Sequence, residues 1–247
     1  MTVVSVPGAE LYVEEAGDGP PLLSISGSGN ALAEGLGPAT LPFAQHFRVV
    51  GWDHRGLGQS TSDDVPITMA DFAADALAVA DSFGWQEFAV FGVSFGGMVA
   101  QELAVTAPER ITRLVLGCTS PGGAGGSSYP LHERPGPTEM AAIIDTRPEV
   151  AQALAGLFGD RQPPKEPGYE RQLQARRTHD VWDRLPRVTA PTLVQAGRFD
   201  GIAPAENSAR IASRIAGSRL EEYDGGHAFY FQDVRAWSDA IAFLQEV

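Results

Sequence analysis

The segment Gly92-Val93-Ser94-Phe95-Gly96 constrains the fold of this chain more than any other stretch. It follows an apolar run, Trp85 to Phe91, that is typical of a buried strand, and it precedes Met98 to Ala104, which has the pattern of a helix. A serine with a glycine two residues before it and another two after it, at a strand-to-helix turn, has the pattern of a nucleophile elbow. The chain must pass so close to its neighbours there that a Cβ at position 92 or 96 would clash. The alternative is a glycine-rich turn whose serine has no catalytic role. Other motifs in the chain are needed to decide between this turn and a nucleophile elbow.

Length and composition limit the classes of protein to which this chain can belong. The 247 residues, 43% of them hydrophobic, are enough for one large α/β domain or for one domain with an inserted lid. The 18 basic and 31 acidic residues give a net charge of −13, which argues against nucleic acid or an anionic membrane surface as a partner. The sequence has no signal-peptide pattern and no apolar stretch of membrane-span length, so we expect a soluble cytoplasmic protein. A single cysteine, Cys118, excludes an internal disulfide and a cysteine-based metal cluster.

Strand and helix patterns alternate along most of the chain. Strands are predicted over 3–6, 11–14, 22–25, 47–52, 85–91, 111–116, 191–196 and 219–223. Helices are predicted over 38–46, 68–83, 98–104, 205–215 and 234–244, the second of them opened by a capping box of Thr68 and Asp71. This alternation predicts an α/β fold with a mostly parallel eight-stranded sheet and helices on both faces.

The alternation stops between residues 121 and 186. The segment begins with a glycine-rich run, Pro121 to Ser128, whose composition predicts a flexible hinge. Helical patterns then cover 138–146, 149–158 and 169–178. We therefore expect a core domain of residues 1–120 and 187–247 and a helical cap, or lid, of residues 121–186.

A serine at such a turn needs a base to accept its proton and an acid to orient that base. His227 follows the last predicted strand in a loop at the carboxyl edge of the sheet, where open α/β sheets bind their ligands. Asp200 stands beyond the strand at 191–196. Both are predicted to complete a catalytic triad with Ser94. The alternatives are a loop-stabilising histidine and a turn or helix-start aspartate, with Asp224, itself more typical of a turn, as the competing acid.

Two N–H donors must also meet the oxyanion of a tetrahedral intermediate. The elbow supplies the backbone N–H of Phe95, and we assign the second donor to Ser28 in the loop Ser26-Gly27-Ser28-Gly29. A simple glycine-rich turn is the alternative interpretation of this loop. It lacks the later glycine of a dinucleotide fingerprint and the lysine of a P-loop, so it is not predicted to cradle phosphate.

Taken together, these motifs resemble those of the α/β-hydrolase superfamily from Val3 to the C-terminus. Four motifs agree with it in order and spacing: Ser26 to Gly29, Asp53 to Ser60, Gly92 to Gly97, and Gly197 to Asp200 with Gly226-His227. Many members carry histidine where Ser26 stands, and this histidine anchors the oxyanion loop. The resemblance implies a structural role for Asp53 and Arg55. The run Met98 to Gln101 is similar to the 3-oxoadipate enol-lactonase-like branch.

The resemblance implies a serine hydrolase that cleaves small-molecule esters or lactones without a cofactor or metal, as a monomer or homodimer. Cleavage of a C–C bond, perhydrolysis or acyl transfer, and a ligand receptor that retains the triad stay open as alternatives. His179 and Trp182, near the end of the cap, could reach the pocket. Six cap arginines could hold a substrate carboxylate or lie on solvated helix faces: Arg134, Arg147, Arg161, Arg171, Arg176 and Arg177.

Overall fold

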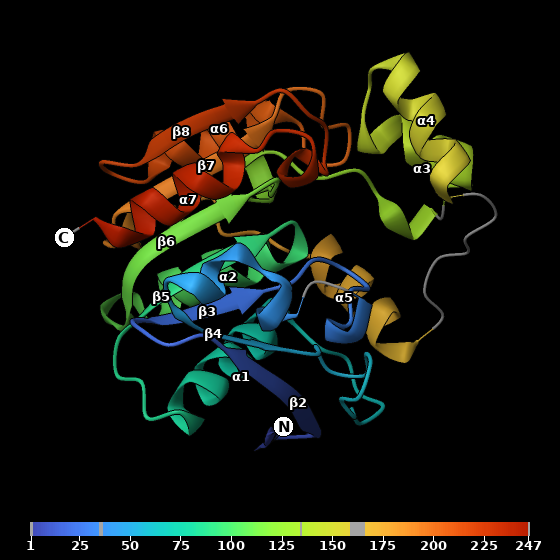
Figure 1. Cartoon of the computed structure of the whole chain (residues 1–247). Coiled ribbons are helices and arrows are strands. Elements are labelled where there is room, and N and C mark those ends of the chain that lie inside the picture. The colour runs from blue at the N-terminus through green and yellow to red at the C-terminus, as the bar shows by residue number, and fades with distance from the viewer. Residues whose placement is uncertain (1, 35–36, 134, 159–165, 247) are drawn as a thin grey trace.

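The computed structural model describes residues 2–34, 37–133, 135–158 and 166–246 (Figure 1). Its strands are β1 (Thr2–Val6), β2 (Ala9–Ala16), β3 (Pro21–Ile25), β4 (Arg48–Trp52), β5 (Phe88–Val93), β6 (Ile111–Gly117), β7 (Thr192–Gly197) and β8 (Arg219–Tyr223). They form one sheet in the order β1-β2-β4-β3-β5-β6-β7-β8. β2 pairs antiparallel with β1 and β4, and the other neighbouring strands run parallel. The predicted sheet is therefore confirmed.

The α-helices fall close to the predicted ranges. They are α1 (Met69–Ser82), α2 (Phe95–Thr106), α3 (Pro137–Ile144), α4 (Pro148–Phe158), α5 (Pro167–Arg177), α6 (Ala205–Arg214) and α7 (Arg235–Gln245). The capping box of α1 forms as predicted, since Thr68 and Asp71 each accept a backbone N–H from the other. Within the described residues, no helix combines the length and the apolar character that a membrane span requires.

Successive residues of the central strands point to opposite faces of the sheet, so each strand contributes to two cores. On one face, Leu23 and Val50 pack with apolar residues of α1, α2 and α6. On the other face, Leu22 and Val49 pack with α7 and with aromatic residues of the loops. The continuous apolar runs in the sequence are thus explained by burial on both sides.

One predicted helix is wrong. Residues 38–46 form two 3₁₀ turns, Pro38–Thr40 and Pro42–Gln45, instead of an α-helix. Between them Leu41 is extended, with φ −81° and ψ 137°. Pro42 explains the break, because proline disfavours helical backbone in the residue before it and has no N–H to continue the helix.

The insertion between β6 and β7 carries α3, α4 and α5. Figure 1 shows α3 and α4 set apart from the sheet, with α5 closer to it. The two ends of the insertion meet, because Gly122 forms a β-bridge with Asp180 and the Val181 N–H donates to the Pro121 carbonyl at 3.0 Å. A role for this segment as a cap stays a prediction.

The glycine-rich start of the insertion is tightly packed, so the prediction of a flexible hinge there is wrong. A Cβ at Gly122, whose φ is +73°, would lie 1.9 Å from the His179 carbonyl oxygen. A Cβ at Gly125 would lie 2.3 Å from the Trp182 ring. The glycines therefore serve close packing and a left-handed backbone, two demands that composition alone does not distinguish from flexibility.

Candidate active site

The chain turns sharply at Ser94, between β5 and α2. Ser94 has φ 56° and ψ −117°, a backbone conformation that is strained for a residue with a side chain. A Cβ at Gly96 would lie 2.0 Å from the Ile25 carbonyl oxygen, and one at Gly92 would lie 2.5 Å from the Gly96 carbonyl oxygen. The two glycines thus allow the crowded turn that their spacing predicts.

Ser94, His227 and Asp200 come together from three separate loops. The His227 Nε2 lies 2.9 Å from the Ser94 Oγ, and its Nδ1 lies 2.8 Å from the Asp200 Oδ2. Asp200 is buried, and its Oδ1 accepts the N–H groups of Ile202 and Ala203 at 2.8 Å each. With Nδ1–H donating to Asp200, Nε2 is free to accept the serine proton.

The competing acid, Asp224, points elsewhere. Its side chain is 69% exposed and pairs with Arg147, 3.0 Å away. Between the two candidates, the contact to His227 is made by Asp200.

The predicted oxyanion donors are positioned near this serine. Phe95 is the first residue of α2, where a backbone N–H has no partner within the helix. Among the described residues the Ser28 N–H has no hydrogen-bond partner either. A Cβ built on its neighbour Gly27 would lie 3.5 Å from the Ser94 Cβ, so the loop runs directly beside the serine. The assignment of Ser28 and Phe95 to an oxyanion hole stays a prediction.

The motif from Asp53 to Ser60 has the contacts of a structural loop. The Asp53 carboxylate accepts the N–H groups of Leu32 and Gln59 at 2.7 and 2.8 Å. Arg55 forms a bidentate, buried ion pair with Asp75 of α1. None of these contacts involves the triad.

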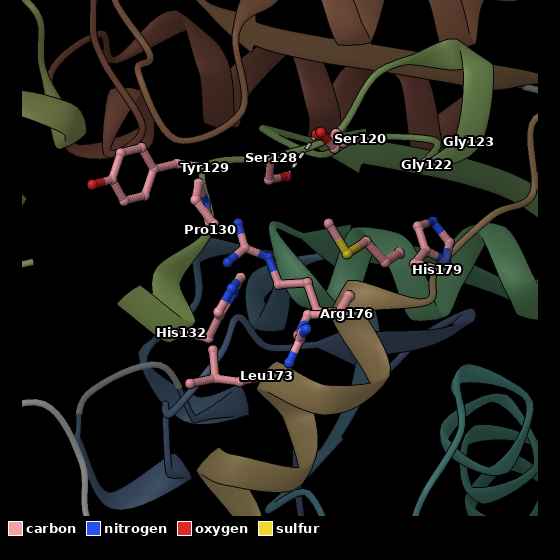
Figure 2. A pocket seen from close by; sticks show the side chains of 13 residues that line it. Ser120, Gly122, Gly123, Ser128, Tyr129, Pro130, His132, Leu173, Arg176 and His179 are labelled. Carbon is pink, nitrogen blue, oxygen red and sulfur yellow. Dashed lines mark hydrogen bonds between the residues drawn. The ribbon is translucent and has the colours of Figure 1, made fainter. Parts of the chain in front are cut away.

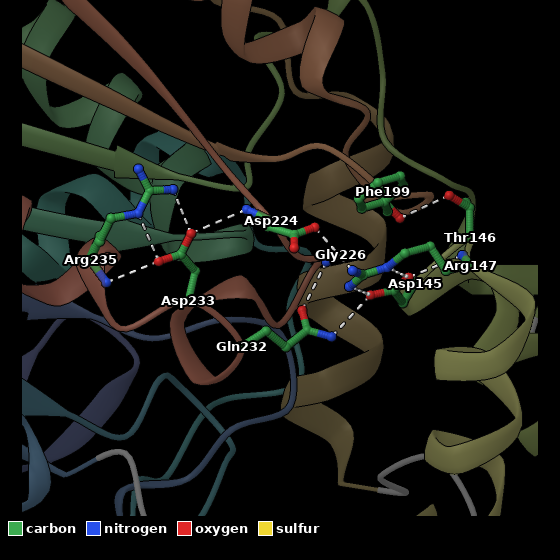
Figure 3. A network of polar contacts seen from close by, with 9 residues as sticks. All are labelled: Asp145, Thr146, Arg147, Phe199, Asp224, Gly226, Gln232, Asp233 and Arg235. Carbon is green, nitrogen blue, oxygen red and sulfur yellow. Dashed lines mark hydrogen bonds and ion pairs between the residues drawn. The ribbon is translucent and has the colours of Figure 1, made fainter.

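A polar network that the sequence did not suggest ties the insertion to the loops of the triad (Figure 3). Asp145, which follows α3, is fully buried and is held by Arg147, whose Nη2 lies 2.7 Å from its Oδ2. The same carboxylate accepts from Gln232, which in turn accepts the Gly226 N–H at 2.8 Å. Burial alone would raise the pKa of Asp145, but hydrogen bonds from Arg147 and Gln232 hold it below its usual value.

Backbone contacts join the same segment to both triad loops. The His227 N–H donates to the Ile144 carbonyl at 2.6 Å, and the Gly201 N–H donates to the Ile143 carbonyl at 2.9 Å. The Thr146 N–H donates to the carbonyl of Phe199 at 2.9 Å. Residues 143–147, which we call the α3 clamp, therefore hold the loop of Asp200 and the loop of His227 together.

A cavity of about 280 Å³ lies between the insertion and α2. Figure 2 shows Arg176, His132 and His179 among its lining residues. His179 lines this cavity, whereas Trp182 does not line it and packs under the Arg214 guanidinium. Contact of either residue with a substrate stays a prediction.

The cap arginines have different partners. Arg147 belongs to the α3 clamp, Arg171 pairs with Asp64 at 3.2 Å, and Arg176 and Arg177 line the cavity. Arg134 and Arg161 lie outside the described residues.

Cys118 is the one cysteine of the chain, and it lies beside the triad. Its Sγ and the nearest ligand atoms of Asp200 and His227 all lie within 4.8 Å of one another. Burial raises the pKa of this thiol, and the Asp200 carboxylate raises it further. A protonated thiol is a poor metal ligand, and both His227 nitrogens are already engaged, so the group does not fit a metal site.

Two residues that support loops near the site carry no local sequence signal. Gln172 of α5 accepts the Gly29 N–H at 2.8 Å and so supports the loop of Ser28. Asn207 of α6 donates to the Ser120 Oγ at 2.8 Å. These contacts join segments far apart in the chain, and only the tertiary structure reveals them.

Comparison with known proteins agrees with this architecture. A family model described as alpha/beta hydrolase fold matches residues 24–131. A protein of Azorhizobium caulinodans provisionally named carbamate hydrolase RutD is 30% identical over 246 residues, covering 90% of this chain and 89% of the relative. 3-Oxoadipate enol-lactonase 2 of Acinetobacter baylyi is 25% identical over 213 residues, covering 81% of this chain and 79% of that protein.

Among solved structures, the enol-lactonase of Burkholderia xenovorans superimposes with a TM-score of 0.82 at 23% identity, covering 99% of this chain and 100% of that one. The eight-stranded sheet, the sharp turn at Ser94 and these likenesses lead to one conclusion. The chain is a member of the α/β-hydrolase family.

Proposed function

We propose that this hydrolase cleaves carboxylic esters or lactones through a covalent acyl-enzyme on Ser94. The observation that carries the proposal is the hydrogen-bonded chain from the Ser94 Oγ through His227 to the buried Asp200, with distances of 2.9 and 2.8 Å. This is the arrangement that an activated serine nucleophile needs.

In the proposed reaction, His227 accepts the Ser94 proton as the Oγ attacks the acyl carbon. The N–H groups of Phe95 and Ser28 stabilise the oxyanion of the tetrahedral intermediate. His227 then donates its proton to the leaving alkoxide, and a water activated by the same imidazole releases the acyl group. Asp200 holds the ring in the required tautomer and stabilises the imidazolium that forms.

Carbamate cleavage is a second candidate. It is favoured by the name of the 30% identical relative, and it uses the same attack on an acyl carbon. The two candidate substrates differ at the acyl carbon, which carries a carbon substituent in an ester or lactone and a nitrogen in a carbamate.

Pre-steady-state kinetics test the proposal. With p-nitrophenyl butyrate we expect a burst of nitrophenolate of about one equivalent per chain, because an acyl-enzyme accumulates before hydrolysis. The kcat/KM values of an ester, a lactone and a carbamate of similar size then rank the substrate classes. Turnover without any covalent adduct on Ser94 would refute the mechanism, and turnover of the carbamate alone would replace the ester by the second candidate.

A further inference from the structure

The cavity between the insertion and α2 is cationic in an otherwise acidic protein. The chain has 31 acidic and 18 basic residues, yet the described residues that line the cavity include Arg176 and Arg177 and no carboxylate. Lining side chains come from α2, from the start of the insertion and from α5 with the residues that follow it (Figure 2). The cavity therefore offers a positive local field to a ligand that enters it.

Arg176 is the centre of this field. Its neighbours in the insertion, Arg147, Arg171 and Arg184, each contact a carboxylate. The Arg176 guanidinium, on a half-buried side chain, has no ion pair or hydrogen bond to any described residue. Burial lowers the pKa of Arg176 to about 10, so it stays protonated at neutral pH. A charged group that is partly removed from water without a partner is destabilising, and an anion of the ligand would offset that cost.

His179 adds a polar group that is poorly satisfied by the protein. It is 6% exposed and lines the cavity, and neither of its ring nitrogens has a hydrogen-bond partner among the described residues that meets normal geometry. A neutral imidazole offers one donor and one acceptor. A ligand oxygen could therefore pair with this ring as well as with Arg176.

Ser94, Asp200 and His227 are not among the lining residues of the cavity, but two lining residues lie close to them in the chain. Its lining residue Met98 lies one turn along α2 and donates its N–H to the Ser94 carbonyl at 3.2 Å. Ser120, also in the lining, lies two residues beyond Cys118, whose thiol is beside Asp200 and His227. The charge of Asp200 also acts on Arg176. A substrate attacked by Ser94 can thus extend one end toward Arg176.

We propose that this cavity binds a carboxylate carried by the substrate, with the Arg176 guanidinium as its counter-ion and His179 as a hydrogen-bond partner. The inference rests on the hydrolytic function proposed for Ser94 and narrows its substrate to esters or lactones with a second, anionic group.

Two esters of equal length test this inference by kinetics. Mono-p-nitrophenyl adipate carries a terminal carboxylate, and p-nitrophenyl hexanoate is its neutral counterpart. We expect wild type to prefer the adipate ester, and Arg176→Gln to lower this preference about 10- to 100-fold, as loss of a charge-assisted hydrogen bond implies. Arg176→Lys should restore part of it. Arg187→Gln removes the same charge from an exposed residue outside the lining and should leave the preference unchanged.

A binding measurement separates this inference from the proposed reaction. In a Ser94→Ala background, calorimetric titration with monomethyl adipate should give a Kd at least about 10-fold tighter than that of Ser94→Ala/Arg176→Gln. Equal Kd values in the two proteins, or an equal preference in wild type and Arg176→Gln, would overturn the anion site even if wild type hydrolyses esters. Binding that depends on Arg176 in a protein without esterase activity would instead support the anion site and refute the proposed reaction.

Discussion

At the scale of single residues, the site depends on which carboxylate holds His227. The buried Asp200 does so at 2.8 Å, whereas Asp224 is exposed and contacts Arg147. We expect Asp200→Asn to lower kcat by about 10³- to 10⁴-fold, because the imidazole loses the partner that fixes its tautomer. Asp224→Asn is the matched control and should change kcat only a few-fold. Steady-state kinetics of both variants test this prediction. A larger loss of kcat in Asp224→Asn than in Asp200→Asn would identify Asp224 as the acid.

Two buried histidines should make the stability of the protein depend on pH. Burial lowers the pKa of His54 to about 4, and it does the same for His179. In the unfolded chain these groups bind protons below about pH 6.5, whereas in the folded chain they do so only near pH 4. The two neutral histidines therefore do not reduce the free energy of unfolding above about pH 6.5. Between pH 6.5 and pH 4 the unfolded chain binds more protons, so the free energy of unfolding falls, by about 2 kcal/mol per histidine between pH 7 and pH 5.

Urea unfolding of wild type and His54→Gln at several pH values measures this effect. The variant should show a smaller change of unfolding free energy between pH 7 and pH 5, whatever its absolute stability. Parallel pH profiles for the two proteins would show that His54 does not contribute.

At the scale of elements, sequence patterns predicted the strands well, because each buried strand is a short apolar run bounded by turn residues. They failed at residues 38–46, where Pro42 interrupts an apolar segment, and at Gly122 and Gly125, where close contacts come from residues more than 50 positions away. Ser94, Asp200 and His227 could be proposed because each follows a strand at the same sheet edge. The α3 clamp could not be predicted, because its contacts are backbone hydrogen bonds and ion pairs with loops that only folding brings close to it.

The α3 clamp leads to a prediction at this scale. Arg147→Gln removes the main partner of the fully buried Asp145 carboxylate and should destabilise the fold by about 3 kcal/mol. It should also lower kcat about 10-fold or more, because residues 143–147 hold the loops of Asp200 and His227. Arg48→Gln, which breaks a surface pair with Glu15, should cost less than about 1 kcal/mol and leave kcat unchanged. Thermal unfolding and kinetics test both, and wild-type kcat in Arg147→Gln would show that the clamp does not position the triad.

At the scale of the whole molecule, the sheet and the insertion contribute different parts of the candidate site. The sheet core presents Ser94, Asp200 and His227 at one edge, and the insertion adds the cavity and the α3 clamp. Residues 143–147 form backbone hydrogen bonds with the loop of Asp200 and the loop of His227. A movement of α3 away from the sheet would therefore displace these two residues relative to Ser94.

The proposed mechanism requires Ser94 to be the nucleophile. Its most direct test is mass spectrometry of the protein after reaction with a fluorophosphonate, combined with ester turnover by Ser94→Ala. We expect one phosphonyl adduct per chain, located on Ser94, no adduct in Ser94→Ala, and a loss in kcat of about 10⁴-fold or more in that variant. An adduct on another residue, or near-normal turnover by Ser94→Ala, would contradict the proposed mechanism.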